Sequence, residues 1–122
     1  MLLFTEFSSF QKTLKATDMQ VLFNTNNTVN GHQRMEAYVS SRVNEVFKRF
    51  DEMITRVEVH LSDQNGDKPG KGDQQCRIEV RLRGMNPITV TSREDEMEQA
   101  INNGLKKALG TIDKAVDKAR AH

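Results

Sequence analysis

The fold is decided by residues 54–83, which read ITRVEVHLSDQNGDKPGKGDQQCRIEVRLR. Two segments of this stretch, 54–62 and 76–83, alternate apolar and polar side chains, which is the pattern of a β-strand with one buried face. The apolar positions are Val57, Val59 and Leu61 in the first segment and Cys76, Ile78, Val80 and Leu82 in the second. The connector 63–74 is polar and rich in Gly and Asp, so we expect a hairpin loop there.

Two shorter segments outside this stretch show the same alternation. Residues 19–24 carry an apolar side chain at every odd number, and residues 88–91 carry one at every even number. Each of the last three strands therefore has one apolar and one polar face. We expect helices to cover only one side of the resulting sheet.

Two segments have the spacing of amphipathic helices. The first follows Asn30, which with Gln33 forms a capping-box-like pair, and the second follows a Ser92–Asp95 pair of the same kind. The expected core positions are Met35, Val39, Val43, Val46 and Phe50 in the first helix, with Phe47 at the edge, and Met97, Ile101, Leu105, Ala108, Ile112 and Ala115 in the second, with Leu109 and Val116 flanking.

The order β-α-β-β-β-α over residues 19–122 predicts an α+β fold, a two-layer sandwich of a four-stranded sheet with two helices on one face. The 122 residues and their 36% apolar and 29% charged composition suit one globular domain. Residues 1–18 form a separate extension with apolar side chains at helical spacing, Leu3, Phe7, Phe10 and Leu14. We expect a helix that docks on the domain or self-associates, with a frayed extension as the alternative.

The sequence contains no recognisable catalytic or metal-binding pattern. The three histidines, His32, His60 and His122, have no ligand spacing to one another, and the single Cys76 excludes an internal disulfide. We therefore expect no enzymatic activity, no metal and no cofactor. The start of the chain lacks the features of a secretory signal, and no apolar run reaches the roughly 20 residues that span a bilayer. This predicts a cytoplasmic protein with no membrane partner.

The basic residues suggest a different kind of site. The net charge is only +1, so a nucleic-acid-binding role requires the basic residues to gather on one surface. The candidates are Arg42, Lys48 and Arg49 in the first helical segment and Lys106, Lys107, Lys114, Lys118 and Arg120 in the second. Because both helices cover the same side of the sheet, their outer faces can merge into a surface that attracts phosphate backbone. On charge alone we favour the commoner explanation, in which each helix simply has a solvated charged face.

The element order, together with four stretches of sequence, resembles a known family. The stretches are MQVLFN at 19–24, YVSSRVNEVFKRFD at 38–51, RVEVHL at 56–61 and EMEQAI at 96–101. In this order they resemble the bacterial ribosome hibernation-promoting factors and ribosome-associated inhibitors, also called the sigma-factor modulation or ribosomal subunit interface family. The chain is similar to the short members, which lack a C-terminal dimerising domain, and residues 1–18 show no counterpart.

The resemblance implies a fold related to double-stranded-RNA-binding domains. It also implies that the protein binds the decoding region of the small ribosomal subunit through ribosomal RNA. There it would silence idle ribosomes in stationary phase or stress. Carried over by position, Arg42, Lys107, Lys114 and Lys118 occupy basic sites of the family.

A second function stays open, a regulatory protein-interaction module with the same fold and weak or no binding to ribosomal RNA. Its basis is that Gly110 stands where Arg is common in the family and Glu45 where Lys is common. The apolar stripe of residues 1–18 would then serve contacts with protein.

Overall fold

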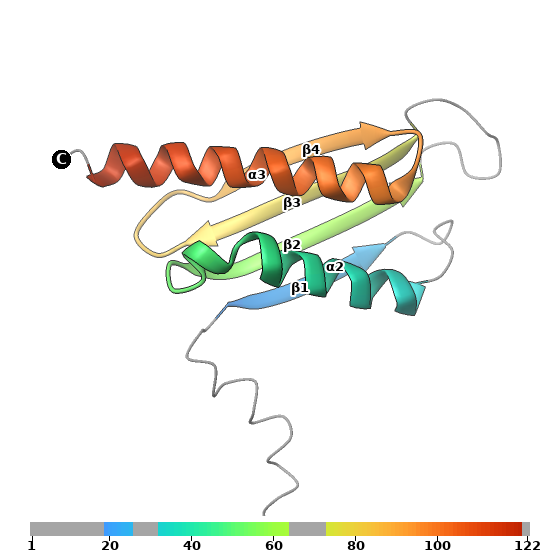
Figure 1. The fold of residues 1–122 in the computed structure, drawn as a ribbon, viewed down its shortest axis with the longest axis horizontal. Coiled ribbons are helices and arrows are strands. Elements are labelled where there is room, and N and C mark those ends of the chain that lie inside the picture. The colour runs from blue at the N-terminus through green and yellow to red at the C-terminus, as the bar shows by residue number, and fades with distance from the viewer. Residues whose placement is uncertain (1–18, 26–31, 64–72, 121–122) are drawn as a thin grey trace, which may run out of the picture.

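A computed structural model describes residues 19–25, 32–63 and 73–120 of the chain. The structure contains a four-stranded sheet and two α-helices. Figure 1 shows that both helices lie across the same face of the sheet. The elements are β1 (Gln20–Thr25), α2 (His32–Val46), a 3-10 turn η1 (Lys48–Phe50), β2 (Ile54–Asp63), β3 (Gln74–Leu82), β4 (Ile88–Glu94) and α3 (Met97–Arg120). The predicted β-α-β-β-β-α order and the α+β class are confirmed.

The strands lie in the order β1-β2-β3-β4. The pair β1–β2 is parallel and is joined by α2, whereas β2–β3 and β3–β4 are antiparallel. A parallel pair needs a crossover connection, and α2 provides it on the same face that α3 covers. One face of the sheet is therefore packed against helices, and the other is open, as the alternating strands predicted.

The core lies between the sheet and the two helices. All seven apolar positions predicted from residues 54–83 are buried. In β2 the alternation breaks once, because Ile54 and Val57 are both buried although they are three residues apart. The pairing register shifts at this point, from Ile54 opposite Leu82 to Arg56 opposite Arg81. This is a β-bulge, which lets both apolar side chains face inward.

The first helix ends earlier than predicted. The periodicity extended it to Phe50, but α2 ends at Val46 and the chain continues into η1. Phe47 was expected at the edge of the apolar stripe, whereas it is fully buried, and Phe50 is buried as well. The tighter 3-10 turn has three residues per turn, so it brings these two rings, three residues apart, to the same side. The predicted cap Asn30 lies outside the described residues.

The predicted Ser92–Asp95 cap of the second helix is wrong. Strand β4 continues to Glu94, so Ser92 lies within the strand, and α3 begins only at Met97. The Ser92 side chain is 2% exposed and faces the helices, and its Oγ has no hydrogen-bond partner among the described residues. Pairing of β4 with β3 continues past the local capping signal and keeps Ser92 in the sheet.

Helix α3 packs closely on the sheet at Gly104. A Cβ added there would lie 3.1 Å from Ile78 Cδ1 and 3.5 Å from Cys76 Sγ, so only glycine allows this approach without a shift. Further along the helix, Val116 is buried and Ala115 only half-buried, the reverse of the prediction. Within the described residues, no helix is long and apolar enough to span a membrane.

Candidate nucleic-acid interface

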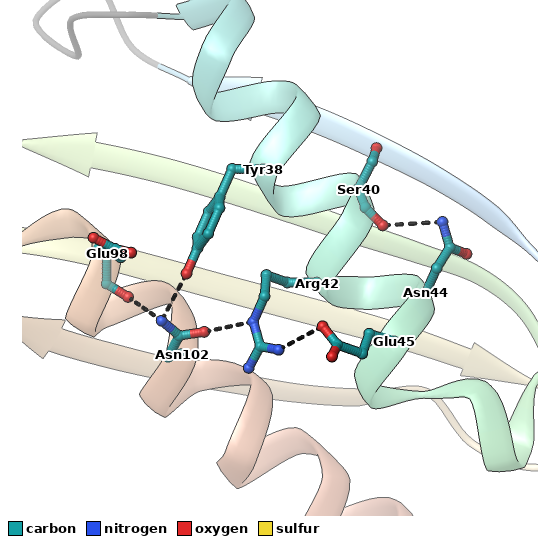
Figure 2. A network of polar contacts seen from close by, with 7 residues as sticks. All are labelled: Tyr38, Ser40, Arg42, Asn44, Glu45, Glu98 and Asn102. Carbon is teal, nitrogen blue, oxygen red and sulfur yellow. Dashed lines mark hydrogen bonds and ion pairs between the residues drawn. The ribbon is translucent and has the colours of Figure 1, made fainter.

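A polar network joins the two helices at Asn102 of α3 (Figure 2). The Asn102 Nδ2 group donates to Tyr38 Oη at 2.9 Å and to the Glu98 carbonyl at 3.0 Å. Its Oδ1 accepts a hydrogen bond from Arg42 Nε at 2.9 Å. One amide side chain thus holds a tyrosine and an arginine of α2 at a fixed spacing from α3, because each of these bonds has a directional requirement.

Arg42, predicted as a binding residue, lies in the gap between the helices. Its side chain is only 31% exposed, and its Nη1 donates to Glu45 Oε1 at 2.8 Å. Nε and Nη1 are therefore both engaged within the protein, and the positive charge is partly balanced by Glu45. Arg42 has the arrangement of a residue that connects α2 to α3, with a limited part of the guanidinium left accessible.

The next predicted cations follow at the end of α2. Arg49 Nη2 lies 3.0 Å from Asp113 Oδ1 of α3, and the Arg49 guanidinium carbon lies 4.6 Å from the centre of the Phe50 ring. Lys48 is exposed, and no interaction of its side chain is seen among the described residues. An exposed ion pair of this kind contributes only about 0–1 kcal/mol to stability, but it lowers the positive charge that η1 presents to a polyanion.

The lysines of α3 lie on the opposite flank of that helix. Lys107 Nζ donates to the Thr91 carbonyl of β4 at 2.9 Å, so this side chain points to the β4 edge. Lys114 and Lys118 follow at spacings of seven and eleven residues and share that flank. The other flank of α3 is contacted by α2 through Asn102 and by η1 through Asp113, so the lysines are separated from Arg42 and Arg49. We call Lys107, Lys114 and Lys118 the lysine column.

The remaining predicted residues of α3, Lys106 and Arg120, lie off the flank of the lysine column, because helical spacing turns both toward the side of α3 that carries Asn102. Lys106 is exposed on the outer side of α3, and Lys118 and Arg120 occupy the last turn of the helix. In Figure 1 the C-terminal turns of α3 project beyond the β3–β4 connection. Cations at the last turn are favoured by the partial negative charge of the helix C-terminus. This end of α3 is thus a stable, protruding basic segment.

Gly110 interrupts the basic surface. It is exposed in the middle of α3, and a Cβ added there would have no heavy atom within 4 Å. In helical spacing its neighbours are Lys106 and Lys107 before it and Asp113 and Lys114 after it. Packing therefore does not explain the glycine here, unlike Gly104, and the position is an open gap with three lysines and one aspartate around it.

Two features of the described residues bear on catalytic chemistry. No group of three or more His, Cys, Asp or Glu side chains in this part of the chain could hold a metal ion. Burial raises the pKa of the Cys76 thiol to about 12, so the thiol is not a nucleophile at neutral pH. What the described surface offers is charge for electrostatic binding.

Two arginines on the open face of the sheet, Arg77 and Arg93, were not among the predicted site residues. Both are exposed, and neither forms an ion pair among the described residues. The alternation of residues 76–83 places Arg77 on the polar face of its strand, but a position on that face is not by itself a signal for binding. Only the pairing register and the ion pairs distinguish these two arginines from their neighbours.

Comparison with known proteins gives two kinds of similarity. Among solved structures, the chain is similar to the N-terminal domain of Protein Y from Thermus thermophilus, with 15% identity and a TM-score of 0.63 over 79% of this chain and 98% of that one. It is also similar to a ribosomal subunit interface protein from Coxiella burnetii, with 12% identity and a TM-score of 0.66 over 81% and 99% of the two chains. At these identities the structures show a shared fold. No curated protein matches the sequence.

The second similarity is to a family. Residues 13–120 match the model of the family described as sigma 54 modulation protein / S30EA ribosomal protein. The match begins six residues before the predicted domain boundary, so residues 13–18 do have a counterpart in the family, contrary to expectation. Because the match covers nearly the whole chain, this protein belongs to the sigma 54 modulation protein / S30EA ribosomal protein family.

Proposed function

We propose that this protein is a non-enzymatic ribosome-associated factor. It binds the decoding region of the small ribosomal subunit through ribosomal RNA and keeps idle ribosomes silent in stationary phase or stress. The observation that carries the proposal is the lysine column, which a member of this family presents on an accessible flank of α3. The names of the two structural neighbours, Protein Y and a ribosomal subunit interface protein, agree with this role.

The chemistry of the site favours phosphate over bases. Lysine is a compact point charge that contacts phosphate oxygens without reading sequence, and the described basic surface carries no exposed aromatic side chain for stacking. Binding would then be driven largely by release of counterions. The lysine column together with Lys106 and Arg120 offers five phosphate contacts. A plot of log K, where K is the association constant, against the logarithm of the salt concentration should therefore have a slope of about −3.5 to −4.5.

Cosedimentation tests this function directly. Stationary-phase lysate is separated on a sucrose gradient at low salt, and purified protein is titrated onto isolated small subunits. We expect the unaltered chain to migrate with ribosomal particles. The triple variant Lys107→Ala, Lys114→Ala, Lys118→Ala should bind more weakly and with a slope shallower by about 2–2.7.

The matched control keeps the charge and changes the side chain. The triple variant Lys107→Arg, Lys114→Arg, Lys118→Arg should retain both affinity and slope, because only positive charge is required at these sites. If the unaltered protein stays in the light fractions at low salt, ribosome binding is not its function. Circular dichroism of both variants checks that the fold is kept.

One observation favours the second candidate function, a protein-interaction module. Arg42 of α2 and Arg49 of η1 are both paired with acids, Glu45 and Asp113. A module of this kind would use the apolar stripe of residues 1–18, which lies outside the described residues. Sedimentation equilibrium of the full chain and of the variant Phe7→Glu, Phe10→Glu separates the two candidates. A dimer that this variant dissociates favours the module, and an identical monomer for both chains counts against it.

A further inference from the structure

The open face of the sheet carries its charges in rows. The register places Arg56 opposite Arg81, Glu58 opposite Glu79 and His60 opposite Arg77. Each carboxylate is paired along its own strand. Arg56 Nε lies 3.0 Å from Glu58 Oε2, and Arg81 Nη2 lies 3.0 Å from Glu79 Oε2. The two glutamates are thus already engaged with two of the arginines on this face.

The arginines that stay uncompensated are Arg77 and Arg93. Within the described part of the chain neither has an acidic partner, and Arg93 Nε donates to Gln75 Oε1 at 3.0 Å, which orients its guanidinium. Gln75 and Arg93 are directly paired across β3 and β4, as are Arg77 and Thr91. Both arginines therefore lie at the β4 side of the open face.

Arg93 lies on the edge strand β4, and only this strand separates Arg77 on β3 from the lysine column. Thr91, which pairs with Arg77, is the residue whose carbonyl accepts the hydrogen bond from Lys107 Nζ at 2.9 Å. β4 is the outermost strand of the sheet, and neighbouring strands lie about 4.8 Å apart. Basic side chains thus follow one another from the flank of α3, across the β4 edge and onto the open face.

We propose that this edge, formed by Lys107, Thr91, Arg77 and Arg93, is a second phosphate-binding surface that takes the backbone of an RNA strand. The proposal rests on the proposed function and extends it, because RNA would contact the protein on both sides of β4. The surface ends at the last residue of β4, because the carboxylate of Glu94 is negative there and accepts a hydrogen bond from Asn103 Nδ2 of α3 at 2.8 Å.

The composition of the edge identifies the partner as a polyanion. The outward side chains of β4 are Thr89, Thr91 and Arg93, all exposed and polar. A protein interface is centred on buried aromatic or aliphatic anchors, and this edge has none. The one exposed large apolar side chain in the described part of the chain, Leu22 at 40% exposure, lies on β1 at the opposite edge of the sheet. Phosphate contacts require only charge and hydrogen-bond donors.

The charge test uses the variant Arg77→Gln, Arg93→Gln in small-subunit binding titrations at several salt concentrations. We expect the slope of log K against log salt to become shallower by about 1.4–1.8, which at 0.1 M salt corresponds to binding about 25- to 60-fold weaker. The control Arg77→Lys, Arg93→Lys keeps the charges and should keep the slope of the unaltered chain. This inference is overturned if the glutamine variant keeps the affinity and the slope of the unaltered chain while the lysine-column variant binds more weakly. That result leaves the proposed function intact. No binding by the unaltered protein overturns both.

A site-directed probe tests whether ribosomal RNA lies against the β4 edge without removing any charge from the protein. The native thiol of Cys76 is buried, so an iron chelate that reacts with thiols attaches only to an introduced cysteine. The probe is placed by Thr89→Cys at the proposed edge, by Leu22→Cys at the opposite edge and by Thr111→Cys on α3. Cleavage of ribosomal RNA from position 89 but not from position 22 supports the surface. Cleavage from position 111 alone shows that the RNA stays on the helix side and overturns it.

Discussion

Gly110→Arg tests whether the gap among the α3 lysines limits binding. The position is exposed and has free space around it, so an arginine side chain meets no steric obstacle. It adds one cation between Lys106, Lys107 and Lys114. If the new guanidinium contacts one more phosphate, the slope of log K against log salt should steepen by about 0.7–0.9. At 0.1 M salt this corresponds to binding about five- to eightfold tighter.

The effect of this change on stability should be small because two contributions oppose each other. Replacing glycine by arginine in a helix interior stabilises by about 0.8 kcal/mol. Repulsion from the three lysines at i−4, i−3 and i+4 costs about 0.2–0.5 kcal/mol each, and attraction to Asp113 at i+3 offsets one such amount. The free energy of unfolding should therefore change by less than about 0.5 kcal/mol.

Gly110→Ala is the matched control for both measurements. It gains the helix propensity of about 1 kcal/mol without the charge, which for a domain of this size raises Tm by about 4 °C. Its affinity for small subunits should equal that of the unaltered chain. The reasoning is refuted if Gly110→Arg binds no more tightly than Gly110→Ala, since the surface around position 110 would then not face RNA.

Three further predictions concern the packing that supports the site. In urea unfolding, Gly104→Ala should gain less than the roughly 1 kcal/mol expected for Gly110→Ala, because its Cβ would lie 3.1 Å from Ile78 Cδ1. Gly104→Leu should destabilise the protein by about 1–3 kcal/mol through overpacking. A full gain in helix propensity at Gly104 would contradict the close approach of α3 to the sheet. Asn102→Leu should cost about 1–3 kcal/mol in unfolding free energy and broaden the NMR signal of the Arg42 Nε–H group, and an unchanged stability would show that the network does not hold the helices. The Cys76 thiol should react with a thiol reagent only on unfolding. Burial raises its pKa from 9.0 to about 12, so the free energy of unfolding should fall by about 1.4 kcal/mol per pH unit between pH 9.0 and about 12, where the thiol ionises only in the unfolded chain. Cys76→Ala should remove this pH dependence.

The sheet could be predicted because its signal is local and repeated. Alternation in residues 54–62 and 76–83 decides which side chains face inward. The same side chains face inward whichever strand pairs with these two. The Ser92–Asp95 cap failed for the opposite reason. A Ser followed by an acid three residues later fits a helix start, but here the ladder between β3 and β4 continues and keeps Ser92 in the strand. A local signal is overridden when a longer-range pairing competes for the same backbone.

The site was predictable only as a set of residues. Helical spacing shows that Lys107, Lys114 and Lys118 share a face, but the direction of that face follows from contacts with distant residues, such as the bond to the Thr91 carbonyl. The pairing of Arg42 with Asn102, 60 residues apart, has no local signature either. For the same reason, the predicted merging of both helix faces could not anticipate that α2 contacts the flank of α3 opposite the lysine column.

The net charge of +1 is a poor guide to what this surface can bind, because the acids are not shared evenly among the cations. Within the described residues the ion pairs of Glu45, Asp113, Glu58 and Glu79 are all made with arginine, apart from a contact between His60 and Glu58. The lysines of α3 take part in none of them. Arginine presents a planar set of donors that suits a carboxylate, whereas lysine is strongly hydrated and flexible. Intramolecular pairing therefore engages arginines between or along the elements and leaves the lysines at the β4 flank with their charge intact. A nearly neutral chain can in this way present a locally positive surface.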